Sequence, residues 1–252
     1  MKTAILTGAS SGLGVWYAKQ IRAVFPEIEC LWLVARREER LAALASELGD
    51  LQTVVLPLDL QLDASVETLK EKLAAEQPDV ALLINNAGLG YLGNVGEGDW
   101  RRQTQMIDVN VRALTAVTHV VLPYMHAGGH ILNTSSIASF CANARLNTYS
   151  AAKAYVSSFT RGLAVELAGS GVTATAVCPG PMATEFLSVG GITGNSKSFE
   201  SLPYCDPRKV TKGALEAARK GKTIYTPTAF YKLYRLVAKV LPHALVARWA
   251  KC

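Results

Sequence analysis

Residues 3–14 read Thr3-Ala4-Ile5-Leu6-Thr7-Gly8-Ala9-Ser10-Ser11-Gly12-Leu13-Gly14, and they decide the fold of this chain. The first four residues form an apolar run typical of a buried strand, and a helix is predicted from Val15 to Val24. A strand that leads through a glycine-rich turn into a helix indicates a nucleotide-phosphate site, because the backbone can approach the pyrophosphate at the helix N-terminus. The spacing Gly-x3-Gly-x-Gly differs from the Gly-x-Gly-x-x-Gly dinucleotide fingerprint, so the alternative is an ordinary strand-to-helix turn.

The same alternation of strand and helix continues along the whole chain. We predict strands near residues 3–7, 29–35, 53–58, 80–85, 129–135, 172–178 and 223–226, and long helices near 100–124 and 147–169. This order predicts an α/β fold with a doubly wound, seven-stranded parallel sheet and helices on both faces. A length of 252 residues suits one domain, and a composition that is 50% hydrophobic and 18% charged suits a sheet covered on both sides.

The composition argues against a secreted, metal-binding or membrane-spanning protein. Met1 and Lys2 lead directly into the first strand without a secretory signal, and Pro123 and two glycines break the uncharged stretch 113–144. Neither the four histidines nor the five cysteines show a metal-ligand spacing, so we expect no metal and a reducing, cytoplasmic location. The cysteines are Cys30, Cys141, Cys178, Cys205 and Cys252, of which Cys30 and Cys178 lie in predicted strands and are expected to be inert core residues.

Tyr149 and Lys153 form the candidate chemical centre. Their spacing of four residues places the phenol and the ammonium on one helix face. A fixed cation favours the phenolate, so we expect Lys153 to lower the pKa of Tyr149 from its usual value of about 10. Ser136, thirteen residues before Tyr149, can hold a substrate oxygen against the same phenol. The three side chains together indicate proton transfer to or from a carbonyl or alcohol oxygen, although an exposed helical pair is the simpler alternative.

The end of the second predicted strand indicates the cofactor. An NAD site commonly carries an acidic residue there for the ribose hydroxyls, whereas an NADP site needs a cation for the 2′-phosphate. This strand ends in Ala35 and is followed by Arg36, whose guanidinium suits a phosphate. We therefore predict NADP(H) with Arg36 as a ligand, and assign Arg37 to the start of a charged helix from Arg36 to Leu48.

These motifs resemble the short-chain dehydrogenase/reductase family, and the resemblance covers nearly the whole chain. The glycine-rich turn matches the family's cofactor turn, and Asp59 matches the acid that meets the adenine. Asn110, Ser136, Tyr149 and Lys153 match the catalytic tetrad. Ser135 competes with Ser136 for the role of catalytic hydroxyl, but the offset to Tyr149 favours Ser136. Ser11 stands where some NADP-using members carry a basic residue, so recognition of the 2′-phosphate would rest mainly on Arg36.

The resemblance implies a single-domain Rossmann fold over residues 1–252 and an NADP(H)-dependent oxidoreductase that interconverts a ketone and a secondary alcohol. It implies that Tyr149 acts as general acid and base, that Ser136 binds the substrate oxygen, and that Lys153 also holds the nicotinamide ribose. Asn110 would anchor a water that relays protons. The implied cofactor-binding residues are Gly8, Ser10, Ser11, Gly12, Leu13, Gly14, Arg36, Asp59, Leu60, Asn86, Ala87, Gly88, Tyr149, Lys153, Pro179, Gly180, Met182 and Thr184.

The substrate site is predicted to be apolar. Residues 182–206 mix glycines with apolar side chains, which suits a small mobile lid over a hydrophobic ketone or alcohol. The expected substrate contacts are Ser136, Tyr91, Phe140, Leu146 and Phe186, with Cys141 nearby. Hydroxysteroid dehydrogenases are abundant among family members with an apolar lid, so the resemblance favours a steroid or bile-acid substrate. The alternative substrates are a 3-oxoacyl or other long-chain or small carbonyl compound. The alternative of another class is a non-catalytic protein that senses NADP(H) or a membrane-associated interaction protein.

Residues 228–252 predict an amphipathic helical tail. Lys232, Arg235 and Lys239 share one predicted helix face, and the opposite face is apolar, formed by Phe230, Leu233, Tyr234, Val237 and Leu241. Such a helix can lie on a membrane, or pack on the core or on a partner subunit. A net charge of +6 suits anionic ligands such as NADPH, and no nucleic-acid-binding module is visible. The family resemblance implies a homodimer or homotetramer formed through the two long helices.

Overall fold

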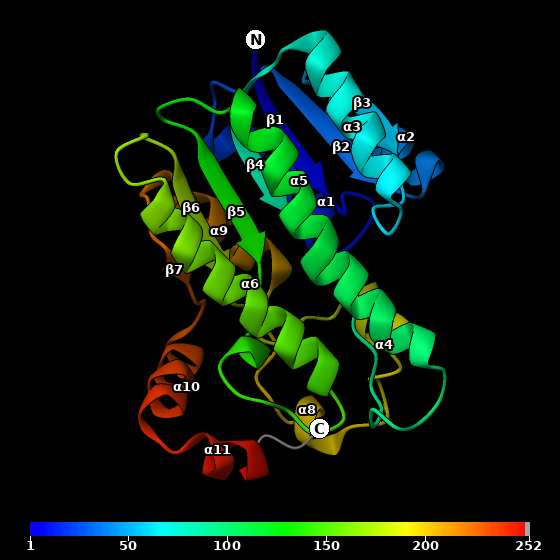
Figure 1. Ribbon diagram of the computed structural model, residues 1–252, viewed down its shortest axis with the longest axis vertical. Coiled ribbons are helices and arrows are strands. Elements are labelled where there is room, and N and C mark those ends of the chain that lie inside the picture. Colours follow the sequence, from blue (N-terminus) through cyan, green and yellow to red (C-terminus); the bar gives the residue numbers. More distant parts are fainter. Residues whose placement is uncertain (250–252) are drawn as a thin grey trace.

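Short apolar runs form one parallel sheet in the computed structural model, which describes residues 1–249 apart from the side chains of residues 197, 198 and 249. The strands are β1 (Lys2–Thr7), β2 (Cys30–Ala35), β3 (Gln52–Pro57), β4 (Asp79–Asn85), β5 (His130–Thr134), β6 (Thr173–Val177) and β7 (Ile224–Tyr225). They pair in parallel in the order β3-β2-β1-β4-β5-β6-β7 (Figure 1). The predicted seven-stranded, doubly wound Rossmann-like sheet is confirmed.

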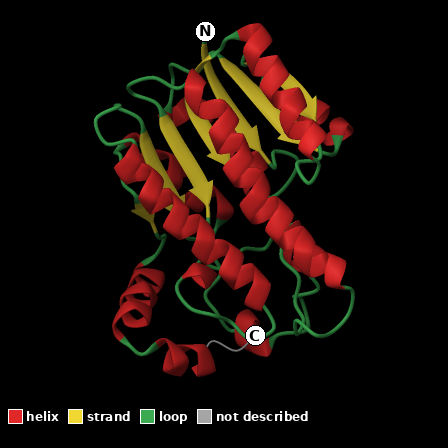
Figure 2. Ribbon diagram, viewed as in Figure 1, coloured by secondary structure: helices red, strands yellow, loops and turns green. Residues whose placement is uncertain are grey.

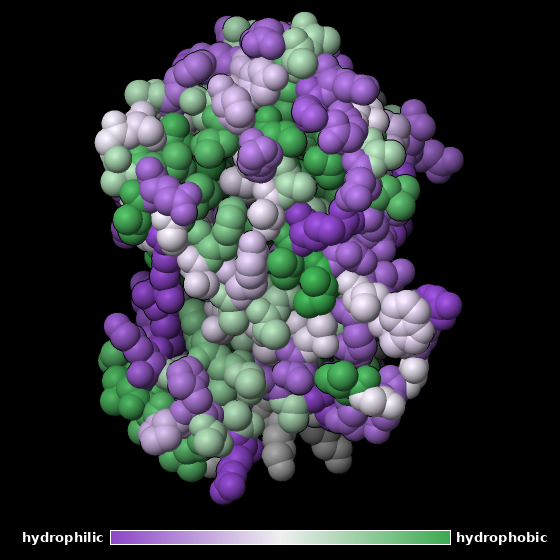
Figure 3. Space-filling model, viewed as in Figure 1, coloured by the Kyte–Doolittle hydropathy of each residue, from purple (hydrophilic) through white to green (hydrophobic). Residues whose placement is uncertain are grey.

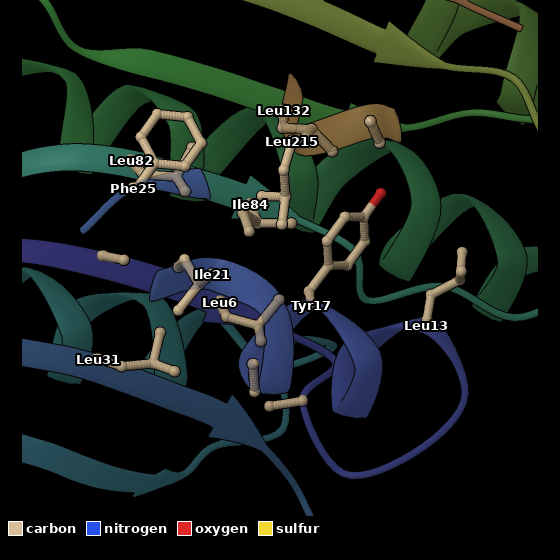
Figure 4. Close-up of a cluster of buried hydrophobic side chains, with 14 of the residues drawn as sticks. Leu6, Leu13, Tyr17, Ile21, Phe25, Leu31, Leu82, Ile84, Leu132 and Leu215 are labelled. Carbon is tan, nitrogen blue, oxygen red and sulfur yellow. The ribbon is translucent and has the colours of Figure 1, made fainter. Parts of the chain in front are cut away.

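Amphipathic helices cover both faces of this sheet (Figure 2). The helices α1 (Leu13–Val24), α2 (Glu38–Glu47) and α9 (Pro207–Arg219) share one core cluster with the sheet, and α3 (Asp63–Glu76), α5 (Leu114–Val121) and α6 (Asn147–Glu166) share the other. In the first cluster Tyr17 and Ile21 of α1 pack between Leu6 and Leu215 (Figure 4). Burial of these apolar surfaces on both faces fixes the sheet that carries the functional site.

The long helix predicted near residues 100–124 is present, but it is not uniform. It consists of α4 (Trp100–Ile107), a π-helical turn at Asp108–Ala113, α5, and a 3₁₀ turn at Leu122–Tyr124. A π-helical turn inserts one extra residue and is common at functional sites. Asn110 lies within this turn, so the irregularity bears on the position of a candidate catalytic residue.

The carboxyl ends of the strands face the part of the molecule that holds the last small helices (Figure 1). These are α7 (Glu185–Val189) and α8 (Lys197–Glu200) of the predicted lid, and α10 (Ala229–Val240) and α11 (His243–Trp249) of the tail. The sheet order reverses between β1 and β4, and open α/β sheets bind ligands in the crevice at such a point. No helix within residues 1–249 is both long and apolar enough to cross a lipid bilayer.

The predicted apolar face of the tail helix is not the face that packs on the core. Tyr231 and Ala238 of α10 are buried, whereas Phe230 and Leu233 of the predicted apolar face are exposed. Successive positions around the helix therefore divide into a core-facing side, an exposed apolar side and a basic side. The remainder of the tail, residues 250–252 including Cys252, lies outside the described residues.

Candidate active site

A cavity of about 530 Å³ opens at the carboxyl ends of the central strands. It brings together residues that lie far apart in the sequence, from the glycine-rich turn to the tail. The predicted cofactor residues that line it are Gly8, Ser10, Ser11, Gly12, Leu13, Arg36, Asp59, Leu60, Asn86, Ala87, Gly88, Tyr149, Lys153, Pro179, Gly180, Met182 and Thr184. Gly14 and Asn110 lie behind this lining. The cavity thus gathers nearly the whole predicted set at the point where the sheet order reverses.

The glycine-rich turn is shaped by close backbone contacts. Gly8 has a φ of +66°, and a Cβ atom on it would lie 2.7 Å from the Cα of Ala87. Gly14 has no room either, since a Cβ atom there would overlap the main-chain oxygen of Gly8. Both positions therefore require glycine, and the exposed backbone forms a cradle that a phosphate can approach.

Asn86 and Thr7 tie this cradle to the end of β4. The side-chain amide of Asn86 donates to the main-chain oxygens of Thr7 and Gly8, at 3.3 and 3.2 Å. In return the hydroxyl of Thr7 accepts hydrogen bonds from the backbone N–H groups of Asn86 and Ala87, at 3.0 and 3.1 Å. Part of the role of Asn86 is therefore to hold the turn in position, in addition to lining the cavity.

Tyr149 and Ser136 meet at the inner end of the cavity. Ser136 is the N-cap of the short turn Ile137–Ser139 that follows β5, and Tyr149 lies in the first turn of α6. Burial raises the pKa of Tyr149 to about 12, and the side-chain hydrogen bond with Ser136 opposes this rise. The phenol is consequently protonated at neutral pH and lies beside the hydroxyl expected to bind a substrate oxygen.

Ser135 points the other way. Its hydroxyl donates to the main-chain oxygen of Lys153 at 2.8 Å and lies 2.8 Å from the hydroxyl of Ser157. These contacts pin α6 to the end of β5. Although Ser135 borders the cavity, its hydroxyl is thus occupied in the packing of α6, and Ser136 is the hydroxyl that reaches Tyr149.

Lys153 is buried beside Tyr149, with its Nζ atom 5.7 Å from the centre of the tyrosine ring. Nζ donates a hydrogen bond to the main-chain oxygen of Thr134 at 2.8 Å. Burial lowers the pKa of Lys153 to about 8. The expectation that Lys153 lowers the pKa of Tyr149 is wrong for this structure, because desolvation of the phenol dominates and the ammonium is engaged with a carbonyl.

Asn110 is buried immediately behind Gly88 and Lys153. Its side-chain amide donates to the Leu89 oxygen at 2.7 Å, and its side-chain oxygen accepts from the Leu89 N–H at 3.3 Å. A Cβ atom on Gly88 would lie 2.7 Å from that side-chain oxygen and 3.3 Å from Nζ of Lys153. The π-helical turn thus aims Asn110 at the same small space as the lysine.

Apolar side chains form the other end of the cavity. Tyr91, Leu146 and Phe186 line it as predicted, and the ring of Phe186 lies 5.5 Å from that of Tyr149, centre to centre. The prediction that Phe140 contacts the substrate is wrong. Phe140 does not line the cavity but packs on α10, with its ring 6.1 Å from that of Tyr234, centre to centre. Cys141 is likewise buried, against Ala238 of α10 and Val246 of α11.

Two arginines follow β2, and both line the cavity. Arg36 lines the cavity as predicted. Arg37 stands at the start of the helix as predicted, since it is the N-cap of α2 and its main-chain oxygen accepts a hydrogen bond from the Leu41 N–H at 3.1 Å. Its guanidinium also donates to the hydroxyl of Ser10 at 3.2 and 3.3 Å. It also forms an ion pair with Glu185. Arg37 is therefore a cavity residue as well as the start of the helix, to which alone the sequence analysis assigned it.

The family is settled by comparison with known proteins. Residues 2–189 match the family model for short chain dehydrogenases. The chain belongs to the short-chain dehydrogenase family. An uncharacterized oxidoreductase of Staphylococcus saprophyticus is 34% identical over 224 residues, which cover 87% of this chain and 92% of that protein.

Two further relatives carry a printed activity or ligand. A Salmonella typhi NADP-dependent 3-hydroxy acid dehydrogenase is 34% identical over 219 residues, covering 82% of this chain and 85% of the relative. A short-chain dehydrogenase from Sphingobium yanoikuyae, solved in complex with NADPH, is 27% identical, with a TM-score of 0.79 and coverage of 97% and 98% of the two chains. This short-chain dehydrogenase is therefore an oxidoreductase by family.

The cavity of this short-chain dehydrogenase includes residues that sequence reasoning did not single out. Gly90 lies against Phe186 and Tyr149, and a Cβ atom there would be 2.7 Å from the Phe186 ring. Tyr231 of α10 packs on Gly180 and donates its hydroxyl to the Pro203 oxygen at 2.6 Å. The aromatic run Phe230-Tyr231 was the available signal, but helical spacing alone did not reveal which ring faces inward.

Proposed function

We propose that this chain is an NADP(H)-dependent oxidoreductase that interconverts a hydrophobic ketone and a secondary alcohol. The observation that carries the proposal is the hydrogen bond between Ser136 and Tyr149 inside a largely apolar cavity, with Lys153 one helical turn away. A complete set for proton transfer has no purpose in a protein that only senses a nucleotide. The name of the Salmonella relative and the NADPH complex of the Sphingobium relative support the choice of NADP(H).

The residues present fit such a cofactor. The turn around Gly8 offers backbone rather than side chains, which suits a pyrophosphate, and Arg36 and Arg37 lie where β2 ends, which suits a 2′-phosphate. Asp59 would meet the adenine, and Thr184 and Met182 would lie beside the nicotinamide. When bound, NADPH supplies the hydride that the carbonyl carbon takes up.

The chain itself supplies the proton. Tyr149 donates the proton of its phenol to the carbonyl oxygen and takes one from the alcohol in the reverse direction. Ser136 holds that oxygen by a hydrogen bond. Lys153 lies one helical turn from Tyr149, with its Nζ atom held by the main-chain oxygen of Thr134, and it would also hold the ribose of the cofactor. Asn110 anchors the water through which the site regains its proton from solvent.

The lining of the cavity supports a hydrophobic substrate. Tyr91, Leu146, Phe186 and the lid residues Leu187 and Ile192 provide apolar surface around Tyr149. A steroid or bile-acid hydroxyl or ketone is our first candidate for the substrate. A 3-oxoacyl, 3-hydroxy acid or other carbonyl compound is the second, supported by the name of the Salmonella relative.

The test is oxidation of NADPH, with NADH in parallel, across steroid ketones, bile-acid ketones, 3-oxoacyl thioesters, small ketones and the 3-oxo acids that correspond to 3-hydroxy acids. Turnover of one class with NADPH preferred supports the proposal. The Tyr149→Phe variant should bind NADPH as the wild type does and lose turnover. Unchanged turnover in that variant contradicts the mechanism, and tight NADPH binding without any turnover favours the sensing role.

We further propose that α10 rests on an anionic lipid surface. Its exposed apolar side carries Phe230, Leu233, Leu236 and Val240, which are 50%, 60%, 58% and 73% exposed. Figure 3 shows hydrophobic side chains gathered over α10 and α11, beside hydrophilic ones. The sequence holds no acidic residue after Glu216. Exposed apolar groups beside cations are typical of an interfacial helix on a cytoplasmic enzyme.

Vesicle co-sedimentation tests this contact. The wild type should bind vesicles that contain phosphatidylserine, and the Leu233→Glu variant should bind them at least about 10-fold more weakly. Sedimentation velocity without lipid measures whether the protein forms the homodimer or homotetramer that we propose. If Leu233→Glu changes the oligomeric state and leaves vesicle binding intact, the exposed side of α10 is a subunit interface.

A further inference from the structure

A carboxylate of the lid bridges two arginines at the ribose end of the cavity. Glu185, the first residue of α7, accepts hydrogen bonds from Arg37 at 3.0 Å and from Arg40 at 2.6 Å, one on each side-chain oxygen. The hydrogen bonds from Arg40 and Arg37 hold the pKa of Glu185 below its usual value. The lid thus carries a permanent anion to a cluster of cations.

Arg37 links this carboxylate to Ser10. The guanidinium of Arg37 donates through Nε and Nη2 to the hydroxyl of Ser10 in the glycine-rich turn, and through Nη1 to Glu185. Arg36, Arg37, Ser10 and Glu185 all line the same cavity. Glu185 therefore binds at the mouth of the cofactor cradle, where β2 ends.

We propose that Glu185 competes with the 2′-phosphate of NADP(H) for Arg37, which lines the cavity, so that this lid residue sets cofactor choice. The inference rests on the proposed use of NADP(H). A carboxylate and a phosphate satisfy the same guanidinium fork, and the phosphate carries more charge and more acceptor oxygens. The phosphate displaces the carboxylate, whereas NAD(H), which has no 2′-phosphate, leaves the bridge in place.

The displacement has a path to the substrate end. Phe186 directly follows Glu185 on α7, and its ring packs on Tyr149 and against Gly90. Release of Glu185 frees the start of α7 and thereby changes the constraint on Phe186. The two ends of the cavity are joined by a single peptide unit of the lid.

Binding measurements on Glu185→Gln test the competition, because glutamine keeps the size of the side chain and removes its charge. We expect the Kd for NADPH to fall about 3- to 10-fold, the range for one or two exposed ion pairs, and the Kd for NADH to change by less than about twofold. The matched control is Glu27→Gln. It removes a comparably exposed ion pair with Arg219, at 3.2 Å, outside the cavity, and should change neither Kd.

Other results for Glu185→Gln would contradict the competition. If Glu185→Gln weakens NADPH and NADH alike, the bridge closes over the bound nucleotide as a clamp, and the competition is overturned. If it changes neither Kd, Glu185 plays no part in cofactor choice. Wild type that binds neither nucleotide contradicts the proposed function itself, and titration by tryptophan fluorescence detects that case without any substrate. A circular dichroism spectrum and an unfolding curve for each variant show that the fold is retained.

Discussion

The ammonium of Lys153 is bound to the main-chain oxygen of Thr134, the last residue of β5, at 2.8 Å. The position of the lysine charge therefore depends on the end of a strand rather than on the neighbouring Tyr149. Ser135 reinforces this arrangement by donating to the main-chain oxygen of Lys153. The sheet thus orients the cation, and α6 orients the phenol.

Stability should depend on pH through Lys153. Burial lowers its pKa from 10.5 to about 8, so between these values the unfolded chain holds a proton that the folded chain has released. Unfolding then takes up a proton, and the free energy of unfolding rises with pH. Relative to Lys153→Met, the wild type should gain about 3 kcal/mol across this window, measured by urea unfolding at a series of pH values. Parallel curves for the two proteins would show that the pKa of Lys153 is not lowered.

Substitution of Gly88 should disturb two catalytic candidates at once. The methyl group of Gly88→Ala would press on the side-chain oxygen of Asn110 and on Nζ of Lys153. We expect kcat to fall about 100-fold, because a displacement near 1 Å has that effect on positioned groups. Gly96→Ala is the control, since a Cβ atom there meets nothing within 4 Å. Equal kcat values for the two variants would argue against a shared role of Asn110 and Lys153.

Loss of the Asn86 amide should loosen the cofactor cradle. Asn86→Ala removes the donors to the oxygens of Thr7 and Gly8, so we expect a loss of about 1–3 kcal/mol in unfolding free energy and weaker NADPH binding. Urea unfolding and nucleotide titration measure the two effects. Asn94→Ala, at an exposed amide bound to Glu97, should cost less than about 0.5 kcal/mol. A stable Asn86→Ala variant with normal NADPH affinity would show that Asn86 does not hold the glycine-rich turn in place.

Phe186 should affect substrate binding, whereas Phe140 should affect only stability. Phe186→Ala removes a ring that contacts Tyr149 in the cavity, so KM should rise about 10-fold, which corresponds to roughly 1.4 kcal/mol of lost burial. Phe140→Ala should leave KM unchanged and lower the unfolding free energy by about 2 kcal/mol, since its ring packs on Tyr234. A raised KM for Phe140→Ala would show that Phe140 contacts the substrate.

Local patterns predicted the sheet and much of the cavity. Apolar runs near residues 3–7 and 80–85 identify strands by length and composition, and the glycine spacing identifies the turn, because each depends on neighbours in the sequence. The spacing from Ser136 to Tyr149 likewise reflects a short connection between β5 and α6. These features can therefore be predicted without knowledge of the tertiary packing.

Other features depend on contacts that no local pattern contains. Arg37 faces the cavity because its backbone is extended, and its partner Glu185 is 148 residues away. Phe140 packs on Tyr234 of α10, which lies far along the chain. The apolar residues of α10 divide between core and surface, since hydrophobic spacing counts both alike. Tertiary geometry decides all three.

The π-helical turn at Asp108–Ala113 makes the chain length between α4 and α5 part of the catalytic design. One residue fewer would restore an ordinary α-helical rise, and it would rotate everything before it by about 100° around the helix axis. While α5 stays fixed on the sheet through Val117 and Val121, the amide of Asn110 would then swing away from Gly88. Deletion of one residue between Asn110 and α5 would therefore keep every candidate catalytic side chain in the sequence and still move Asn110 out of the site.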